Sequence, residues 1–270
     1  MIKAKKSLGQ NFLMHARIAE RIANSAKLTP NMTAFEIGPG TGMLTRELLK
    51  RTKKVIAVEA DYELFEKLQT DFANEITNGS LELTHGDIRT FDISSLPKNY
   101  SLIANIPYYL TGEIFRMFLE SENQPSSITL LVQKEVAERI ARSKKESILS
   151  LSVKAYGTPK YEFTVPRGAF KPAPKVDSAV LTIRDISRKN FSSRGPAYAG
   201  RQEELFFALL HAGFAHKRKF VRKNLADAGF TFPLNASRSS ASGEQASPVL
   251  AEKSRAEDLH LSDWLALVRE

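Results

Sequence analysis

The stretch "TAFEIGPGTGMLTRELLK" (33–50) carries the strongest signal for the fold of this chain. It opens with an apolar, strand-like run at 33–38 and passes through a glycine-rich turn into a segment with helical spacing. A buried strand that enters a helix through such a turn is the first unit of a doubly wound α/β sheet. Gly38, Gly40 and Gly42 allow the backbone to turn sharply and to approach a ligand at the carboxyl edge of that sheet.

The same alternation continues along the chain. Further strand-like runs are expected at 53–60, 80–87, 101–106 and 127–133, with helices at 42–51, 62–76, 112–121 and 134–143. Short buried strands separated by helices predict a mostly parallel sheet with helices on both faces. Residues 161–184 read as strand, proline-rich turn and strand, without room for a crossover helix. They are therefore expected to close the sheet as an antiparallel pair.

The pattern changes near residue 186, where the strand-like runs stop. Helical patterns follow at 203–229 and 255–268, separated by a polar, low-complexity loop at 235–248. We therefore expect two domains: an α/β catalytic domain with a basic N-terminal extension over residues 1–185, and a small all-α domain over residues 186–270.

Positive charge is concentrated in two segments of the chain. The net charge is +9, and 42% apolar and 26% charged residues are ordinary values for a globular protein. Residues 1–27 carry six Lys and Arg against one Glu, and residues 186–225 carry nine against two Glu. Such segments on a nearly neutral body predict a polyanionic partner. The best candidates for RNA phosphate contacts are Lys217, Arg218, Lys219, Arg222 and Lys223.

Several classes of function are disfavoured by composition. The absence of cysteine excludes disulfides, thiolate metal sites and cysteine nucleophiles, and it fits a reducing cytoplasm. The five histidines are scattered, so no metal site is expected. No apolar run approaches the roughly 20 residues that span a bilayer, and the N-terminal lysines are not followed by the apolar stretch of a signal peptide. We expect a cytoplasmic monomer without a membrane partner.

Two carboxylates follow successive strands of the expected sheet. Glu59 ends the second strand, where an acid can accept hydrogen bonds from both hydroxyls of a ribose. Asp87 ends the third, where it can accept one from an adenine amino group, although either acid could instead cap the next helix. Met43 stands where the dinucleotide fingerprint requires its third glycine, and there is no P-loop. An adenosine site without phosphate-binding residues favours S-adenosylmethionine over a nucleotide.

Nine stretches, in this order along the chain, carry a family resemblance. They are "KKSLGQNFL" (5–13), "EIGPGTGMLT" (36–45), "VEAD" (58–61), "HGD" (85–87), "ANIPYYLTG" (104–112), "LLVQKEVAERI" (130–140), "FKPAPKVDSAV" (170–180), "HAGFAHKRKFVRKNL" (211–225) and "RAEDL" (255–259). With them the chain resembles the ribosomal RNA adenine-N6 dimethyltransferases, and among these it is most similar to the members that act on the small subunit.

The resemblance implies a class I S-adenosylmethionine-dependent methyltransferase fold with a helical C-terminal domain. It also implies dimethylation of N6 on two adjacent adenosines in the 3′-terminal hairpin loop of 16S rRNA, with small-subunit rRNA or the 30S particle as partner, in support of small-subunit biogenesis. Donor contacts carry over to Asn11, Leu13, Gly38, Glu59, Asp87 and Asn105, beside Gly40 of the glycine turn.

The stretch "NIPYYL" (105–110) suits the chemistry of a planar amine. The side-chain oxygen of Asn105 can accept one N–H of the adenine amino group, and the carbonyl of Ile106 or Pro107 can accept the other, with the proline ring fixing its direction. Tyr108 offers a face for stacking, worth about 1–3 kcal/mol per base, and Phe170 is expected to form the second face. The sulfonium leaves as a neutral group, so positioning and desolvation suffice for catalysis without a metal.

Structural explanations compete with these roles. A strand end with turn chemistry would account for Pro107, and Phe170 could be ordinary core. Tyr109 is expected to pack inward. For Asn105 the functional role is favoured, because nothing in the sequence pattern requires an amide there.

Three alternative functions remain. A large-subunit (23S) rRNA dimethyltransferase that confers macrolide resistance shares the glycine turn and the "NIPY" type of motif, but the forms of 170–180 and 255–259 favour the small-subunit enzymes. A non-catalytic RNA- or DNA-binding assembly or transcription factor could use the same fold, against which the intact donor site with Asn105 argues. A nicotinamide dehydrogenase is opposed by Met43 and by the basic C-terminal segment.

Overall fold

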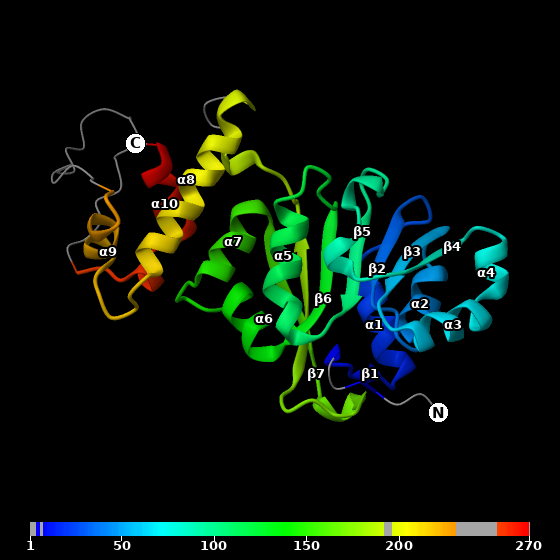
Figure 1. Cartoon of the computed structure of the whole chain (residues 1–270). Helices are drawn as coiled ribbons and strands as arrows, with labels where there is room; N and C mark the ends of the chain where they lie inside the picture. Colours follow the sequence, from blue (N-terminus) through cyan, green and yellow to red (C-terminus); the bar gives the residue numbers. More distant parts are fainter. Residues whose placement is uncertain (1–3, 6–7, 192–195, 231–252, 270) are drawn as a thin grey trace. The chain divides into compact units, whose positions relative to one another are not determined.

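A computed structural model describes residues 4–5, 8–191, 196–230 and 253–269 (Figure 1). The chain forms two compact units, each built from two segments: Met1–Ala141 with Gly157–Ile186, and Arg142–Tyr156 with Ser187–Glu270. The segment 142–156 thus belongs with the C-terminal helices, whereas the sequence pattern predicted it in the N-terminal domain. The expectation that the first domain is catalytic and that the second contacts RNA stays a prediction. The polar loop expected at 235–248 lies outside the described residues, as do some basic residues of both charged segments.

The first unit is built on a seven-stranded sheet. Its strands are β2 (Thr33–Ile37), β3 (Lys54–Glu59), β4 (Leu81–His85), β5 (Ser101–Asn105), β6 (Ser127–Gln133), β7 (Thr158–Val165) and β9 (Ser178–Arg184). They lie in the order β4-β3-β2-β5-β6-β9-β7, in which the first five run parallel and β9 runs antiparallel to both of its neighbours. The parallel sheet and its antiparallel closing pair are confirmed.

Helices cover both faces of this sheet (Figure 1). They are α1 (Ala16–Ser25), α2 (Met43–Leu49), α3 (Tyr62–Asp71), α4 (Ala73–Thr77), α5 (Thr111–Leu119) and α6 (Lys134–Ala141). Ala34 of β2 lies in an apolar cluster with residues of α1 and α2. The next residue, Phe35, faces the other way, and its ring centroid lies 5.9 Å from that of Phe118 in α5. Because successive strand residues point to opposite faces, two helical layers are needed to bury β2.

The N-terminal segment joins this unit through a small second sheet that the sequence pattern did not predict. Strand β1 (Phe12–Leu13) pairs antiparallel with β8 (Phe170–Lys171), which lies in the connection between β7 and β9. The pairing extends to Met14, whose N–H donates to the Ala169 carbonyl at 2.9 Å. Residues 8–13 are thereby held beside the first sheet, although they are distant from it in sequence.

The second unit consists of helices around an aromatic core. Its members are α7 (Ile148–Tyr156), α8 (Pro196–Phe214), α9 (Val221–Asp227) and α10 (Leu261–Arg269). Trp264 of α10 is fully buried and stacks on Phe214 of α8, with ring centroids 5.8 Å apart. A side chain on Gly213 would collide with the Trp264 ring, so this glycine permits close packing of the two helices. No helix among the described residues is long and apolar enough to cross a membrane.

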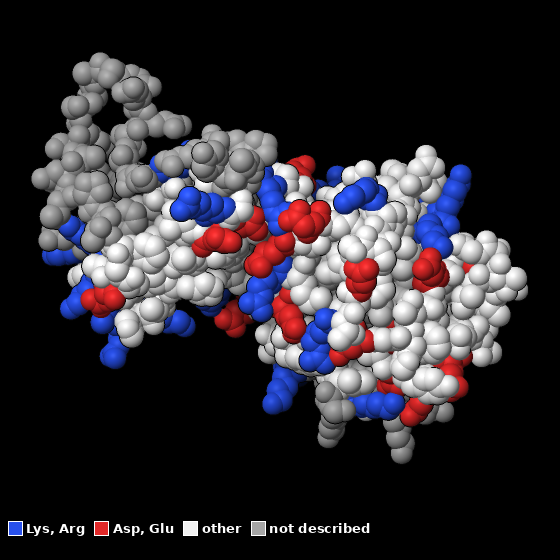
Figure 2. Space-filling view, turned by 45° about the horizontal axis from the view of Figure 1, so that its top comes forward, with Lys and Arg blue, Asp and Glu red and all other residues white. Residues whose placement is uncertain are grey.

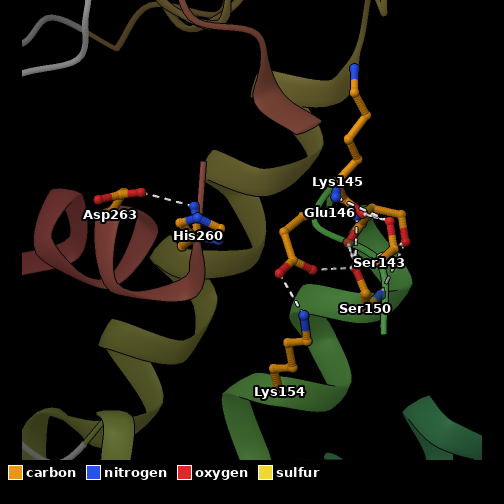
Figure 3. Close-up of polar contacts among 8 residues, drawn as sticks. Ser143, Lys145, Glu146, Ser150, Lys154, His260 and Asp263 are labelled. Atoms are coloured by element: carbon orange, nitrogen blue, oxygen red, sulfur yellow. Dashed lines mark hydrogen bonds and ion pairs between the residues drawn. The ribbon is translucent and has the colours of Figure 1, made fainter. Parts of the chain in front are cut away.

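The segment "RAEDL" (255–259) holds the start of α7 within this second unit. The N–H of Glu146 donates to the Glu257 carbonyl at 2.7 Å, and the Lys145 ammonium lies 2.5 Å from the Glu257 carboxylate. Figure 3 shows the Glu146 side chain between Ser150 and Lys154 of α7, which it contacts at 2.7 and 2.5 Å. These contacts connect the segment 255–259 to the start of α7 and stabilise the helical unit.

Candidate functional site

A single cavity at the carboxyl edge of the parallel strands brings the expected donor and catalytic residues together. Its wall is formed by the segments 8–13, 36–41, 58–60, 86–89 and 105–110, with Phe170. All ten expected residues line it: Asn11, Leu13, Gly38, Gly40, Glu59, Asp87, Asn105, Pro107, Tyr108 and Phe170. Parallel strands end at one edge of a sheet, which is why residues spread over much of the chain converge here.

The glycine turn forms the floor of the cavity between β2 and α2. Gly38, Gly40 and Gly42 have φ angles of 63°, 60° and 78°, a left-handed backbone that glycine adopts without strain. Nothing lies within 4 Å of the position that a Gly38 side chain would occupy, so the turn leaves open space above it. A ligand can therefore approach the backbone closely.

Gly42 provides a test of this turn. A Cβ atom there would lie 2.5 Å from Cε2 and 2.8 Å from Cζ of the buried Phe72 ring. Together with the positive φ angle, this clash is expected to make Gly42→Ala less stable by more than about 2 kcal/mol. Chemical denaturation would measure the loss. Gly112→Ala is the matched control, because Gly112 lies in α5 with nothing within 4 Å of its side-chain position; an equal loss in both variants would contradict the prediction.

Glu59 lies at the end of β3 with its carboxylate directed at the glycine turn. The N–H of Gly40 donates to its Oε2 and the N–H of Asp61 to its Oε1, each at 2.9 Å. The side chain is buried, and burial raises the pKa of Glu59, although these two N–H donors favour its ionised form. Each carboxylate oxygen accepts more than one hydrogen bond. Glu59 is therefore placed to receive hydroxyl groups in the cavity while it holds the turn.

Asp87 caps the next helix and also lines the cavity. Its Oδ1 accepts the N–H of Arg89 at 2.9 Å and thereby caps the short helix η2 (Ile88–Thr90), as the structural explanation predicted. The Arg89 guanidinium also donates to this carboxylate, with Nε at 3.0 Å from Oδ1. This hydrogen bond lowers the pKa of Asp87. The result is an ionised acceptor at the cavity wall.

Asn105 links the "NIPY" segment to the N-terminal segment. Its Nδ2 donates to the Asn11 carbonyl at 3.1 Å, so the expectation that nothing structural requires an amide here is wrong. Its Oδ1 accepts no hydrogen bond from the described residues. The amide therefore uses its donor to hold Asn11 and leaves an acceptor for a ligand in the cavity that both residues line.

The two tyrosines that follow Pro107 have different surroundings. Tyr108 is half-buried, and its hydroxyl lies 2.6 Å from Oγ of Ser178 on β9, a contact that fixes the position of the hydroxyl end of the ring. Tyr109 is 65% exposed, so the expectation that it packs inward is wrong. It lies instead over Gly9, where a Cβ atom would be 3.1 Å from its ring. The short helix η4 (Tyr108–Leu110) turns successive side chains in different directions, whereas a strand would alternate them.

Phe170 belongs both to the core and to the cavity wall. Its side chain is 5% exposed and packs in the apolar cluster around Leu13 and Val180. It also lines the cavity, as Tyr108 does. Phe170 can therefore be a core residue and a cavity residue at once, because the packing that buries most of its ring also fixes the part that faces the cavity.

Glu36 is a cavity residue that the sequence analysis did not single out. It lies inside β2, is 1% exposed, and accepts a hydrogen bond from Oγ1 of Thr45 at 2.7 Å. Burial, reinforced by the charge of Glu59, raises the pKa of Glu36 to about 8. A charged residue at an interior position of a buried strand was the sequence signal that could have revealed it.

The buried carboxyl of Glu36 predicts that stability decreases with rising pH. The folded state binds this proton more tightly than the unfolded chain, whose value is the ordinary 4.5. The stabilisation is therefore complete below about pH 4.5 and is lost as the pH rises to about 8. Glu36→Gln removes the titration, so its melting temperature should fall less than that of the wild type across this range. Glu82→Gln, an exposed change on β4, is the control; equal slopes for all three proteins would contradict the prediction.

The expected RNA-contacting residues lie in the second unit, outside the cavity. Lys217, Arg218 and Lys219 follow α8, and Arg222 and Lys223 lie on α9. Lys219 is engaged with Asp227 at 3.1 Å. Figure 2 shows Lys and Arg side chains gathered at one end of this unit. In the described parts of the chain, no group of three or more His, Cys, Asp or Glu side chains could hold a metal ion.

The strand order, the reversed strand β9, the glycine turn and the strand-end acids define a class I methyltransferase fold. Two solved structures share it at 23% identity each. They are a dimethyladenosine transferase from Plasmodium falciparum, with a TM-score of 0.73 over 95% of both chains, and the 23S rRNA methyltransferase ErmE, with a TM-score of 0.70 over 96% of this chain and 98% of that one.

The family is shown by sequence. The family model for ribosomal RNA adenine dimethylases matches residues 1–266, so the chain belongs to that family. A relative from Dehalococcoides mccartyi, named ribosomal RNA small subunit methyltransferase A, is 38% identical over 274 aligned residues. The alignment spans 100% of this chain and 89% of the relative. The family resemblance noted in the sequence is confirmed.

Proposed function

We propose that this protein transfers methyl groups from S-adenosylmethionine to N6 of two adjacent adenosines in the 3′-terminal hairpin loop of small-subunit (16S) rRNA, two to each base, and so supports small-subunit biogenesis. The observation that carries the proposal is the cavity in which Glu59, Asp87 and the acceptor oxygen of Asn105 converge. We further propose that it acts as a cytoplasmic monomer.

The residues of the cavity fit the methyl donor. Glu59 would accept hydrogen bonds from the ribose hydroxyls and Asp87 one from the adenine amino group, and the open space above Gly38 would admit the rest of the molecule. When bound, S-adenosylmethionine supplies an electrophilic methyl group on a sulfonium that departs as a neutral thioether. The chain's contribution on this side is to bind and orient, because the leaving group needs no proton.

The acceptor base requires two hydrogen-bond acceptors and a flat surface. Asn105 Oδ1 can receive one N–H of the amino group, which directs the nitrogen lone pair towards the donor methyl. The Pro107 carbonyl already receives the N–H of Leu110 at 3.0 Å, so we assign the second acceptor to the Ile106 carbonyl. Tyr108 and Phe170 would hold the base between their rings. Positioning and exclusion of water then account for catalysis, with the product proton passing to solvent.

The target base must leave its stack to enter the cavity, because a paired base cannot reach the edge of the sheet. The basic residues 217–219, 222 and 223 would hold phosphates on either side of the loop. Such contacts position the RNA and make its affinity fall with salt, without selecting sequence.

A large-subunit target is the alternative on the same fold. The small subunit is favoured by the 38% identical relative whose name specifies it and whose match covers the whole chain. The 23S rRNA methyltransferase is 23% identical, a level of similarity that supports the fold alone.

The deciding experiment is methyl transfer from labelled S-adenosylmethionine to small ribosomal subunits that lack their dimethyladenosines, with large subunits in parallel. Label on adenosines of the small subunit is expected. Label confined to large subunits would reassign the target. Absence of label on both, with the donor still bound, would identify a non-catalytic RNA-binding factor on this fold.

A further inference from the structure

The segment 8–13, here called the N-terminal strap, forms one wall of the cavity without belonging to the main sheet. Its C-terminal end is held by the pairing of Phe12 and Leu13 with β8, and its centre by the hydrogen bond from Asn105 to the Asn11 carbonyl. Its N-terminal half has no strand partner. That half is held by a different residue, Asp61.

Asp61 uses one carboxylate oxygen to hold the strap and the other to hold Lys5, which precedes the strap. Its Oδ2 accepts Nε2 of Gln10 at 2.8 Å, and its Oδ1 accepts Nζ of Lys5 at 2.7 Å. The N–H of Lys5 donates in turn to Oε1 of Gln10 at 2.7 Å, so the three residues close a ring of hydrogen bonds. Burial acts to raise the pKa of Asp61, but the hydrogen bonds from Lys5 and Gln10 outweigh it and lower that pKa.

Asp61 is also connected to the donor side of the cavity. It follows β3, and its backbone N–H donates to Oε1 of Glu59 at 2.9 Å. It caps α3 through the N–H of Glu63, which reaches Oδ1 at 3.1 Å. Capping alone would require one oxygen, whereas Oδ2 is directed entirely at Gln10. Asp61 is 2% exposed and accepts hydrogen bonds from an ammonium and from an amide group. A helix cap does not need these additional hydrogen bonds.

We propose that Asp61 is a positioning residue of the donor site, which holds the N-terminal strap over the cavity and thereby increases donor affinity without touching the donor. Asp61 does not line the cavity, whereas Gln10 and its neighbours in the strap do. Loss of the carboxylate would free the unpaired half of the strap and open the cavity to water. The inference rests on the proposed function, because the ligand retained is the methyl donor.

The test compares Asp61→Ser, Gln10→Ala and the double variant. Serine preserves a helix cap but is too short to reach the strap. Binding of S-adenosylhomocysteine, measured by calorimetry, should weaken about 10-fold in either single variant, since each loses a hydrogen bond to a charged group. The double variant should bind no more weakly than Asp61→Ser, because both changes break the same contact. Asp92→Ser makes the same substitution at the N-cap of η3 (Ile93–Ser95), outside the cavity, and should bind as the wild type does.

A second measurement does not depend on the donor. Trypsin cleavage after Lys5, followed by intact mass in the absence of ligand, should be faster in Asp61→Ser and Gln10→Ala than in the wild type or Asp92→Ser. Binding within twofold of the wild type in both single variants would overturn the inference, as would unchanged cleavage. If the wild type itself binds no S-adenosylhomocysteine, the proposed function fails together with the donor part of this inference. The cleavage rates then decide separately whether Asp61 holds the strap.

Discussion

Asn105→Ala is expected to lower the rate of methyl transfer at least about 100-fold, because the acceptor amine loses the group that orients its lone pair. The side-chain oxygen of Asn105 is available in the cavity, whereas its nitrogen is bound to the Asn11 carbonyl. Single-turnover transfer of labelled methyl to small-subunit particles, at saturating donor, would measure the chemical step. A rate within fivefold of the wild type would contradict the assignment.

Two further observations separate chemistry from structure at this position. Asn105→Asp retains an oxygen that can accept the amine N–H but loses the N–H group that binds the Asn11 carbonyl. It should therefore transfer methyl faster than Asn105→Ala, while it binds S-adenosylmethionine more weakly than the wild type does. Thermal unfolding of both variants would show whether the link to the strap contributes to stability. If the two variants are equally slow and equally unstable, the role of Asn105 is structural.

Glu59→Ala is expected to weaken donor binding about 100-fold or more. Hydrogen bonds to a charged group contribute about 1.5–3 kcal/mol each, and two ribose hydroxyls would lose this partner. The Gly40 N–H would lose its acceptor as well, so the glycine turn itself should become less well ordered. Calorimetric titration with S-adenosylhomocysteine measures the effect.

The controls for Glu59 are a conservative variant and a neighbouring carboxylate. Glu59→Gln keeps one acceptor oxygen and should fall between the wild type and Glu59→Ala. Glu82→Gln alters a carboxylate on the adjacent strand β4 that does not line the cavity, and it should bind the donor normally. Donor binding by Glu59→Ala within threefold of the wild type would show that the ribose is recognised elsewhere.

Local signals in the chain were sufficient for the parallel sheet and for most of the cavity. Apolar runs of strand length, a glycine turn and acids at strand ends all depend on residues close together in sequence, and parallel strands then bring those ends to one edge. Glu59 and Asp87 were therefore predictable as cavity residues from their positions alone. Helix α7 was missed, since its apolar residues surround much of the helix and give little periodicity.

Contacts between distant segments could not be predicted in the same way. Strands β1 and β8 contain two residues each, too few to show a period, and they exist because each supplies the other's hydrogen bonds. The outward position of Tyr109 depends on Gly9, which leaves room for its ring. Neither feature has a local signal.

Periodicity and motifs that are continuous in the chain were enough to predict the class of fold, the family and most of the residues that meet in the cavity. The partners of individual side chains came only from the tertiary structure: Asn105 donates to the Asn11 carbonyl, and Asp61 joins helix α3 to the strap. A side chain's partner depends on which distant group packing brings within about 3 Å, and that distance is set by the whole fold.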